Sequence, residues 1–206
     1  MNQNLFFTPT DILLPAHADM RRWSVIACDQ FTADAGYWQA VQDTVGDAPS
    51  TLRLMLPEFY LGKCDEAAAT REIQQTMRRY LDDGVFRTVP HSLVLVQRTL
   101  PGGTVRCGIV GALDLEAYDY APDSVTPIRA TEGTVASRLP ARVRIRAAAA
   151  LEMPHIMVFY SDPEDTIRRE AQAAAGETLY DFDLMSGGGH VRGLRIAGAK
   201  ADALAA

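Results

Sequence analysis

The chain has 206 residues, of which 48% are hydrophobic and 22% are charged, so collagen-like, disordered and disulfide-scaffold classes are excluded. It carries 20 Lys and Arg residues against 26 Asp and Glu residues, and the resulting net charge of -6 does not favour a nucleic-acid partner. No apolar run approaches the roughly 20 residues that a membrane-spanning helix needs.

The cysteine pattern and the amino-terminal residues both favour a cytoplasmic location for the protein. Cys28, Cys64 and Cys107 are far apart and odd in number, which argues against a disulfide framework and a zinc knuckle. The first residues carry no basic group before their short apolar patch, so they do not form a signal peptide. We therefore expect a cytoplasmic protein without membrane or nucleic-acid partners.

The first predicted elements are a strand and a helix. Residues 23–30, WSVIACDQ, have the β-branched composition of a short buried strand, with Asp29 at its end. Tyr37, Trp38 and Val41 follow at helical spacing, and the segment GDAPS breaks that helix.

The next predicted elements are a helix and a β-hairpin. Residues 65–82 place apolar side chains on one stripe and charged ones on the other, and Gly84 supplies the cap. Two strand-like runs, 92–100 and 104–115, flank a Pro-Gly-Gly loop whose glycines tolerate positive φ.

The carboxy-terminal part is predicted to continue in strands. ARVRIR at 141–146 alternates arginines with apolar residues, as a half-buried strand does, and HIMVFY at 155–160 is typical of a buried strand. Pro163 favours the first turn of a helix that runs to about Ala175. The runs LYDFDLM and HVRGLRI flank a Ser-Gly-Gly-Gly turn and predict a closing hairpin.

Taken together, these elements predict a single α+β domain over residues 1–206, with a mostly antiparallel or mixed β-sheet and flanking helices. We expect ten apolar residues of the strand-like runs to be buried on one sheet or on sheets that share a core: Val25, Ile26, Val94, Val96, Ile109, Val143, Ile145, Ile156, Val158 and Phe159.

One segment, IRATEGTVASRLPARVRIR at 128–146, concentrates positive charge in this acidic chain. Guanidinium groups match phosphate or carboxylate bidentately, so the cluster predicts an anion clamp. The alternative is that alternating arginines form the solvated face of a half-exposed strand. The five arginines are Arg129, Arg138, Arg142, Arg144 and Arg146.

The loop at the start of this segment is the predicted centre of the chemistry. Arg129, Thr131, Glu132 and Thr134 surround a glycine between apolar stretches, and such polar loops often carry sites. Glu132 is a candidate general base toward a hydroxyl, although a single loop carboxylate is more often a salt-bridge partner. We expect Arg129 and Glu132 to share one surface depression with at least one arginine of ARVRIR.

The turn SGGGH is a second candidate for phosphate. Consecutive glycines, including Gly188, can aim backbone N–H groups at an anion, and His190 can add charge or transfer a proton. A flexible hairpin tip is the alternative. Asp181 and Asp183 share a strand face and are able to hold Mg²⁺, but a solvated face explains them equally. The histidines form no local ligand motif, so we assign no metal site.

The blocks IRATEGT, PHIMVFY and LYDFDLMSGGGH, together with ILLP, WSVIACDQ and STLRLMLPE, resemble the bacterial and archaeal domain-of-unknown-function family 1015 over nearly the whole chain. Members are typically about twice this length and carry, farther along, a block similar to the nucleotide-phosphate motif of ParB-like proteins and free-serine kinases. The resemblance implies that this chain is the amino-terminal half of the family unit. The loop of Arg129, Glu132 and Thr134 matches the acid-and-threonine segment of the family, so the resemblance implies that it is part of the site. The resemblance also makes Asp29, at the end of the first predicted strand, a second catalytic candidate.

These observations predict a cytoplasmic protein that binds a phosphorylated small molecule or a nucleotide with Mg²⁺. In full-length form it would act as a kinase-like phosphotransferase toward a small hydroxylated metabolite. The alternative is a non-catalytic binding or scaffold domain with a solvated arginine face. If the chain is half of a larger unit, we also expect an exposed apolar patch, or self-association into a homo-oligomer, around residues 187–196.

Overall fold

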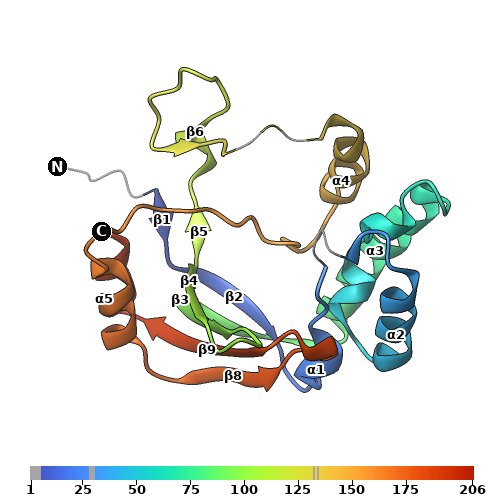
Figure 1. Cartoon of the computed structure of the whole chain (residues 1–206), viewed down its shortest axis with the longest axis horizontal. Coiled ribbons are helices and arrows are strands. Elements are labelled where there is room, and N and C mark those ends of the chain that lie inside the picture. Colours follow the sequence, from blue (N-terminus) through green and yellow to red (C-terminus); the bar gives the residue numbers. More distant parts are fainter. Residues whose placement is uncertain (1–5, 28–30, 132, 134) are drawn as a thin grey trace.

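The structure is a computed structural model that describes residues 6–27, 31–131, 133 and 135–206. Its described part contains an antiparallel sheet in the order β2, β3, β9, β8, with β4 paired to the same edge of β3 as β2 (Figure 1). The α+β class and the antiparallel sheet are therefore confirmed. The strands are β2 (Thr10–Pro15), β3 (Phe86–Thr99), β4 (Val105–Val110), β8 (Thr178–Asp183) and β9 (His190–Ala197).

Strand β3 organises the sheet because it changes partner along its length. Its first half pairs with β2, and its second half pairs with β4 from Val94 onward. At the change, His91 adopts a φ of 38°, and its backbone N–H donates to the Asp11 carboxylate at 2.9 Å. This local bond stabilises an unusual backbone conformation at the point where the pairing register shifts.

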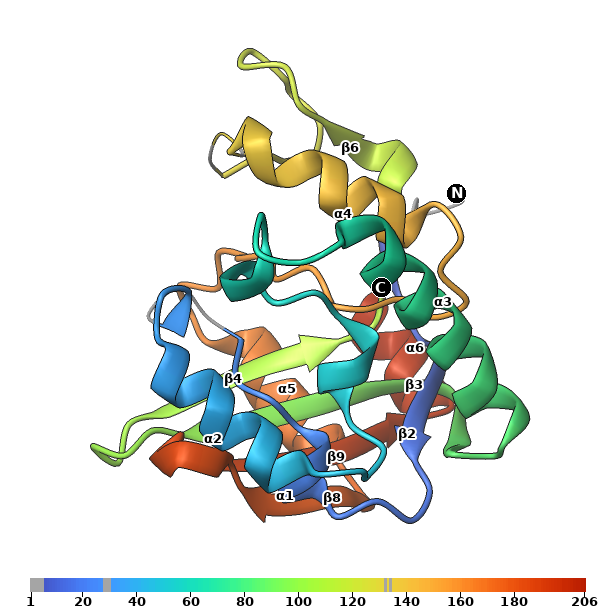
Figure 2. The same ribbon diagram turned by 90° about the vertical axis from the view of Figure 1, so that its right-hand side faces the viewer.

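The helices gather in two groups (Figures 1 and 2). Helices α2, α3 and α4 lie at one end of the molecule, whereas α5 lies at the other end, next to the sheet. The described helices are α1 (Met20–Trp23), α2 (Ala35–Val45), α3 (Glu66–Asp82), α4 (Leu139–Arg146), α5 (Thr166–Ala174) and α6 (Ala199–Ala205). Single turns of 3-10 helix are η2 (Thr51–Leu54), η3 (Glu58–Tyr60), η4 (Leu115–Ala117), η5 (Ala136–Arg138) and η6 (Met185–Gly187).

Helix α3 forms where its sequence predicts. The Asp65 carboxylate caps its first turn by accepting the N–H groups of Ala67 and Ala68, each at 3.0 Å. Its apolar stripe is buried through Ile73, Met77 and Tyr80, which pack with α1 and α4. After the helix, Gly84 takes a φ of 67°, the left-handed conformation that a glycine C-cap supplies.

Helices α5 and α6 cover one face of the sheet. Leu93 and Leu95 of β3 and Ile196 of β9 are buried there against Ala171 of α5 and Ala201 of α6. The Asp162 carboxylate accepts the first N–H groups of α5, which begins three residues after Pro163. Both predicted hairpins, β3–β4 and β8–β9, are confirmed.

Two pairs of short strands complete the fold. Strand β1 (Phe7–Thr8) pairs with β5 (Ala112–Leu113), and β6 (Tyr118–Asp119) pairs in parallel with β7 (Ile128–Arg129). The β6–β7 unit projects away from the main sheet (Figure 1). None of the helices in the described part of the chain is both long enough and apolar enough to cross a membrane.

The strand predicted over residues 23–30 is wrong for the described part of that segment. Trp23 ends α1, and residues 24–27 have no regular secondary structure. Val25 and Ile26 are half-buried because they pack against the apolar face of α2 rather than within a sheet. Asp29, the catalytic candidate at the predicted strand end, lies outside the described residues.

The strand predicted for ARVRIR is also wrong, because this segment is α4. Pro140 is in the first turn of the helix, where its missing N–H costs nothing. Helical spacing separates the two apolar residues that a strand would put together: Ile145 is 9% exposed, whereas Val143 is 61% exposed. The last carbonyls are bonded in part by Gln74 of α3, which donates to the backbone of Arg144 and Ile145.

The third correction concerns residues 155–160, which form no strand in the structure. Ile156, Val158 and Phe159 are exposed, and with Val143 they overturn the expectation of one common set of buried strand residues. Val94 is buried as predicted, and Val96 and Ile109 are half-buried in the sheet. No large apolar side chain of residues 187–196 is exposed, so the apolar patch expected there is absent.

Candidate functional site

The arginines of η5 and α4 are paired with glutamates. Glu58 of η3 accepts from Arg138 at 3.2 Å and from Arg142 at 2.8 Å. Arg144 is 2.5 Å from Glu66, the first residue of α3. These contacts connect the last turns of the arginine-rich segment to η3 and α3, and Figure 2 shows α4 close to the beginning of α3.

Arg146 is satisfied in a different way, by the chain that follows α4. It forms an ion pair with Glu152 and donates to the backbone oxygen of Pro154 at 2.7 Å. Four of the five arginines therefore have carboxylate partners within the chain. Because each carboxylate offsets positive charge, the segment does not form the strong positive face that the anion clamp requires.

Arg129, the remaining arginine, lines a pocket in the β6–β7 unit. The pocket has a volume of about 310 Å³, at the lower end of the range for small-molecule sites. It is lined by Tyr120, Ala121, Pro122, Ser124, Arg129, Ala130, Thr131 and Gly133. Among the described residues, none of the arginines of α4 takes part in this lining, so the common depression predicted for Arg129 and ARVRIR is not found.

Local hydrogen bonds hold the walls of this pocket. The Asp119 carboxylate accepts from the Ala121 N–H at 3.0 Å, and the Ser124 and Thr126 hydroxyl oxygens are 2.7 Å apart. The Arg129 Nε donates to the Thr126 backbone oxygen at 2.8 Å, which fixes the guanidinium at the pocket wall. These short-range contacts allow a loop of mostly polar residues to keep one shape.

The charge of Arg129 is not offset by a carboxylate in the described part of the chain, where no acidic group lies within ion-pair distance of it. Thr131 adds a hydroxyl to the same pocket. Two further candidates of this loop, Glu132 and Thr134, lie outside the described residues. A single arginine beside hydroxyl and backbone groups is suited to binding an anion.

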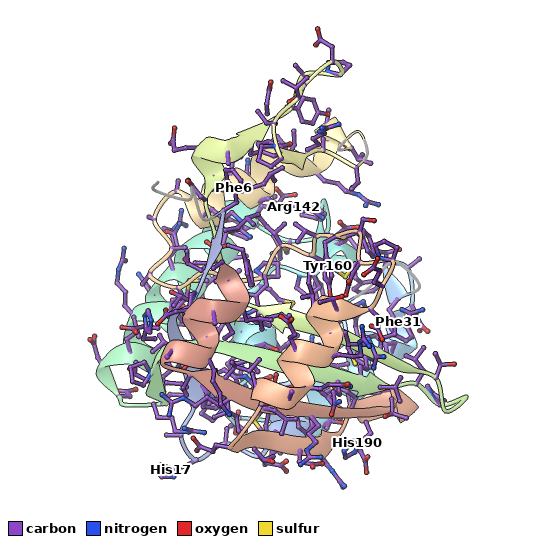
Figure 3. All side chains as sticks on the ribbon, turned by 90° about the vertical axis from the view of Figure 1, so that its left-hand side faces the viewer. Phe6, His17, Phe31, Arg142, Tyr160 and His190 are labelled. Carbon is purple, nitrogen blue, oxygen red and sulfur yellow. The ribbon has the colours of Figure 1, made fainter. Side chains whose placement is uncertain are left out.

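His190 lies elsewhere, at the end of the closing hairpin. Its ring nitrogens contact two carboxylates, Asp181 at 2.6 Å and Asp183 at 2.8 Å. The hydrogen bond with Asp183 raises the pKa of His190, and the same bond lowers the pKa of Asp183. Arg192 and Arg21 pair with the outer sides of the carboxylates, each at 3.4 Å. Figure 3 shows His190 well separated from Arg142.

The glycines before His190 serve packing rather than an open anion cradle. A Cβ on Gly188 would lie 2.2 Å from the Ile26 side chain, and one on Gly189 would lie 2.1 Å from the backbone oxygen of Thr99. The Gly188 backbone oxygen accepts from Arg98 at 3.0 Å. In the described part of the chain, no group of three or more His, Cys, Asp or Glu side chains has an arrangement that could hold a metal ion.

With this geometry established, comparison with known sequences identifies the family. Residues 9–205 match the model of a protein family of unknown function (DUF1015). The chain belongs to this family. No curated protein and no solved structure gives a significant match. The matched region includes almost every element described above, among them the β6–β7 unit. The family description assigns no activity.

Sequence reasoning missed the acidic partners of the arginines and two residues of the pocket. Glu58 and Glu66 are more than 70 residues from the arginines they bind, and no local pattern links the two groups. Tyr120 and Ser124 belong to the stretch YDYAPDSVTP, whose Pro, Asp and Ser residues are typical of a turn-rich loop. That composition was the available signal for a structured loop beside Arg129.

Proposed function

We propose that this domain binds a phosphorylated small molecule in the Arg129 pocket. The observation that carries the proposal is the contrast between Arg129 and the other arginines of the segment. Arg129 faces a pocket without a carboxylate partner in the described chain, whereas Arg138, Arg142, Arg144 and Arg146 are ion-paired. An arginine at a pocket wall favours a ligand that carries negative charge.

The size and lining of the pocket favour a small ligand. A volume of about 310 Å³ accommodates a phosphate group with a small metabolite attached, and it is at the low end of what ligand pockets offer. Ser124 and Thr131 supply hydroxyls that can donate to phosphate oxygens, and Tyr120 supplies an aromatic wall. These features support a sugar phosphate or a similar compound more than a whole nucleotide.

Phosphoryl transfer to a hydroxylated acceptor is a finer proposal that depends on Glu132. In that mechanism Arg129 would stabilise charge on the transferred group, and Glu132 would orient or deprotonate the acceptor hydroxyl. Because Glu132 lies outside the described residues, the pocket geometry supports binding and leaves catalysis to be tested by assay.

A non-catalytic scaffold domain is the second candidate, and the paired arginines favour it. The ion pairs of α4 connect this helix to η3 and α3, which is a structural role. In this case Arg129 would have no ligand, and its exposed charge would be one of several on a solvated surface.

Thermal unfolding with added ligands distinguishes the two candidates. We expect glucose 6-phosphate or inorganic phosphate to raise the melting temperature, since a ligand at 100 times its Kd stabilises the folded state by about 2.7 kcal/mol. Glucose without phosphate is the matched ligand control and should give no shift. The change Arg129→Gln should abolish the shift.

Arg142→Gln is the matched protein control because Arg142 lies in the same segment but outside the pocket. This variant should melt at a lower temperature and still respond to phosphate compounds as the wild type does. If none of the phosphate compounds shifts the wild type, or if Arg129→Gln responds fully, the binding proposal is wrong and the scaffold alternative is favoured.

A further inference from the structure

A groove lies between α2 and α3, and it is separate from the Arg129 pocket. Its volume is about 840 Å³, within the range of small-molecule sites. Residues of α2 form one wall and residues of α3 form the other, and the segment that connects the two helices supplies the rest of the lining. Figure 2 shows this connecting segment between the two helices.

Hydrogen bonds between these elements hold the groove in one shape. The Tyr80 side chain of α3 is 5% exposed, and its hydroxyl accepts from the N–H of the buried Ser50 at 3.2 Å. The Gln42 amide of α2 donates to the Tyr60 hydroxyl at 2.5 Å. Because each bond joins a helix to the connecting segment, the two walls keep their separation without a ligand, as the walls of preformed sites do.

Part of the groove lining is apolar. Ile73 of α3 and Pro57 of the connecting segment are buried, and Leu52 and Met55 are half-buried. The ring of Tyr60, also half-buried, adds an aromatic group to the same lining. Apolar side chains that are only partly covered gain free energy when a ligand removes them from water, so this lining favours a ligand with an apolar or aromatic body.

Most of the charged side chains in the groove are acidic. Asp43 and Asp47 are exposed at the carboxy-terminal end of α2, and no cationic group lies within ion-pair distance of either among the described residues. Asp43 accepts from the Gln39 amide at 2.9 Å. Glu72 of α3, by contrast, has Arg79 at 3.8 Å. Two carboxylates of the lining therefore lack a cationic partner.

The other arginine of the lining, Arg53, is engaged by the end of α2. Its guanidinium donates to the backbone oxygens of Gly46 and Ala48, and Arg22 donates to the Val45 oxygen at 2.8 Å from outside the lining. Carbonyl groups at the end of a helix carry partial negative charge, so they offset the charge of both arginines. The groove keeps an excess of negative charge at this end, which favours a cationic ligand.

We propose that the groove between α2 and α3 binds an organic ammonium ion, in which a primary amine is attached to a flat apolar body. The apolar body would lie against Leu52, Met55 and the Tyr60 ring, and the ammonium group would donate to the carboxylates of Asp43 and Asp47. Because this ligand is positively charged, it differs from the anionic ligand proposed for the Arg129 pocket. A test of one site therefore does not decide the other.

Titrations of the whole chain, followed by proton–nitrogen correlation NMR, test the proposal with three ligands that share an indole ring. We expect tryptamine to shift amide signals of α2, α3 and the segment between them, with a Kd of about 0.1–10 mM, as suits a ligand of this size. Tryptophol, which has a hydroxyl in place of the amine, should bind about 5-fold more weakly, because exposed carboxylates attract a charge only modestly. Indolepropionate, which has a carboxylate there, should bind more weakly still.

A charge-neutral variant locates the ammonium group. The double change Asp43→Asn and Asp47→Asn should weaken tryptamine binding about 5-fold and leave tryptophol binding unchanged, because only the ammonium needs the carboxylates. The matched control is Glu164→Gln with Glu170→Gln, which removes two exposed carboxylates at α5, outside the groove. This control should bind tryptamine as the wild type does.

Three results would overturn the proposal. Equal affinities for tryptamine, tryptophol and indolepropionate would mean that the groove takes apolar rings without selecting a cation. Signals that shift outside α2, α3 and their connecting segment, or no shifts at about 20 mM tryptamine, would mean that this groove is not the site. Equal loss of tryptamine binding in both double variants would mean that net charge, and not Asp43 and Asp47, attracts the ammonium.

Discussion

The Arg142 guanidinium lies 2.8 Å from the Glu58 carboxylate, and Arg138 approaches the same carboxylate from the preceding turn at 3.2 Å. One acid therefore satisfies two arginines on consecutive turns. The Glu58 side chain is only 22% exposed, so this contact is less screened than an ordinary surface pair. It explains how an arginine cluster can exist in an acidic chain without binding a ligand.

Glu58→Gln should therefore destabilise the fold, because it leaves two guanidinium groups facing each other without an acid. We expect a loss of about 1 kcal/mol in the free energy of unfolding, measured by urea denaturation. A double-mutant cycle with Arg142→Gln should show a coupling energy of about 0.5–1 kcal/mol. Additive losses would mean that the two side chains do not interact in solution.

The helical state of ARVRIR can be tested with two apolar residues of α4. Ile145→Ala should cost about 2–4 kcal/mol, because Ile145 is buried against α3. Val143→Ala should change stability by less than about 0.5 kcal/mol, because Val143 is exposed and alanine favours a helix. In the alternating strand predicted from sequence, both changes would be costly, so equal losses would contradict α4.

Local patterns predicted those elements whose signals are complete within the element. Helix α3 has its own cap at Asp65 and its own apolar stripe, and the β3–β4 hairpin has its own loop. ARVRIR failed because a period of two over six residues is too short to decide between strand and helix. The helix is stabilised by residues that are distant in sequence, through the packing of Ile145 against α3 and the ion pairs with Glu58 and Glu66.

HIMVFY failed for a related reason. Its composition favours a strand, but a strand needs a partner, and the described chain supplies none. Of the predicted site, Arg129 and Thr131 lie in one pocket, while His190 lies apart on the main sheet. The sequence identifies these polar residues as candidates. Which of them lie together depends on how the loop around residues 120–124 packs against Arg129 and Thr131 in the β6–β7 unit.

The carboxylates beside His190 predict a pH dependence of stability. The hydrogen bond with Asp183 raises the pKa of His190 above 6.5, so its stabilisation is complete below pH 6.5 and is lost as the pH rises through the raised value. The pKa of Asp183 is lowered from 3.8. The contribution of Asp183 to the stability of the fold is therefore present above pH 3.8 and is lost as the pH falls through the lowered value. The pair therefore stabilises the fold most between these limits.

His190→Gln should remove this contribution. We expect the melting temperature of the variant to lie below that of the wild type between pH 3.8 and 6.5, and the difference to shrink at higher pH. High salt should reduce the difference, because these side chains are exposed. A difference that stays constant into the alkaline range would mean that the imidazolium is not the stabilising form.

The packing of Tyr180 on Gly193 gives the last prediction. These residues are opposite each other on β8 and β9, and a Cβ on Gly193 would lie 2.2 Å from a carbon of the Tyr180 ring. Gly193→Ala must therefore displace the ring and should cost about 1–3 kcal/mol by overpacking. Gly108→Ala on β4 is the matched control: a Cβ there meets nothing within 4 Å, so we expect no loss and a gain of up to about 1 kcal/mol from reduced freedom of the unfolded chain.

An optical readout separates displacement of the Tyr180 ring from a general loss of stability. Burial raises the pKa of Tyr180 to about 12, and in folded Gly193→Ala the displaced phenol should ionise closer to its ordinary value of 10.0. A Gly193→Ala protein with wild-type stability and an unchanged phenol titration would show that the ring does not pack on the glycine in solution.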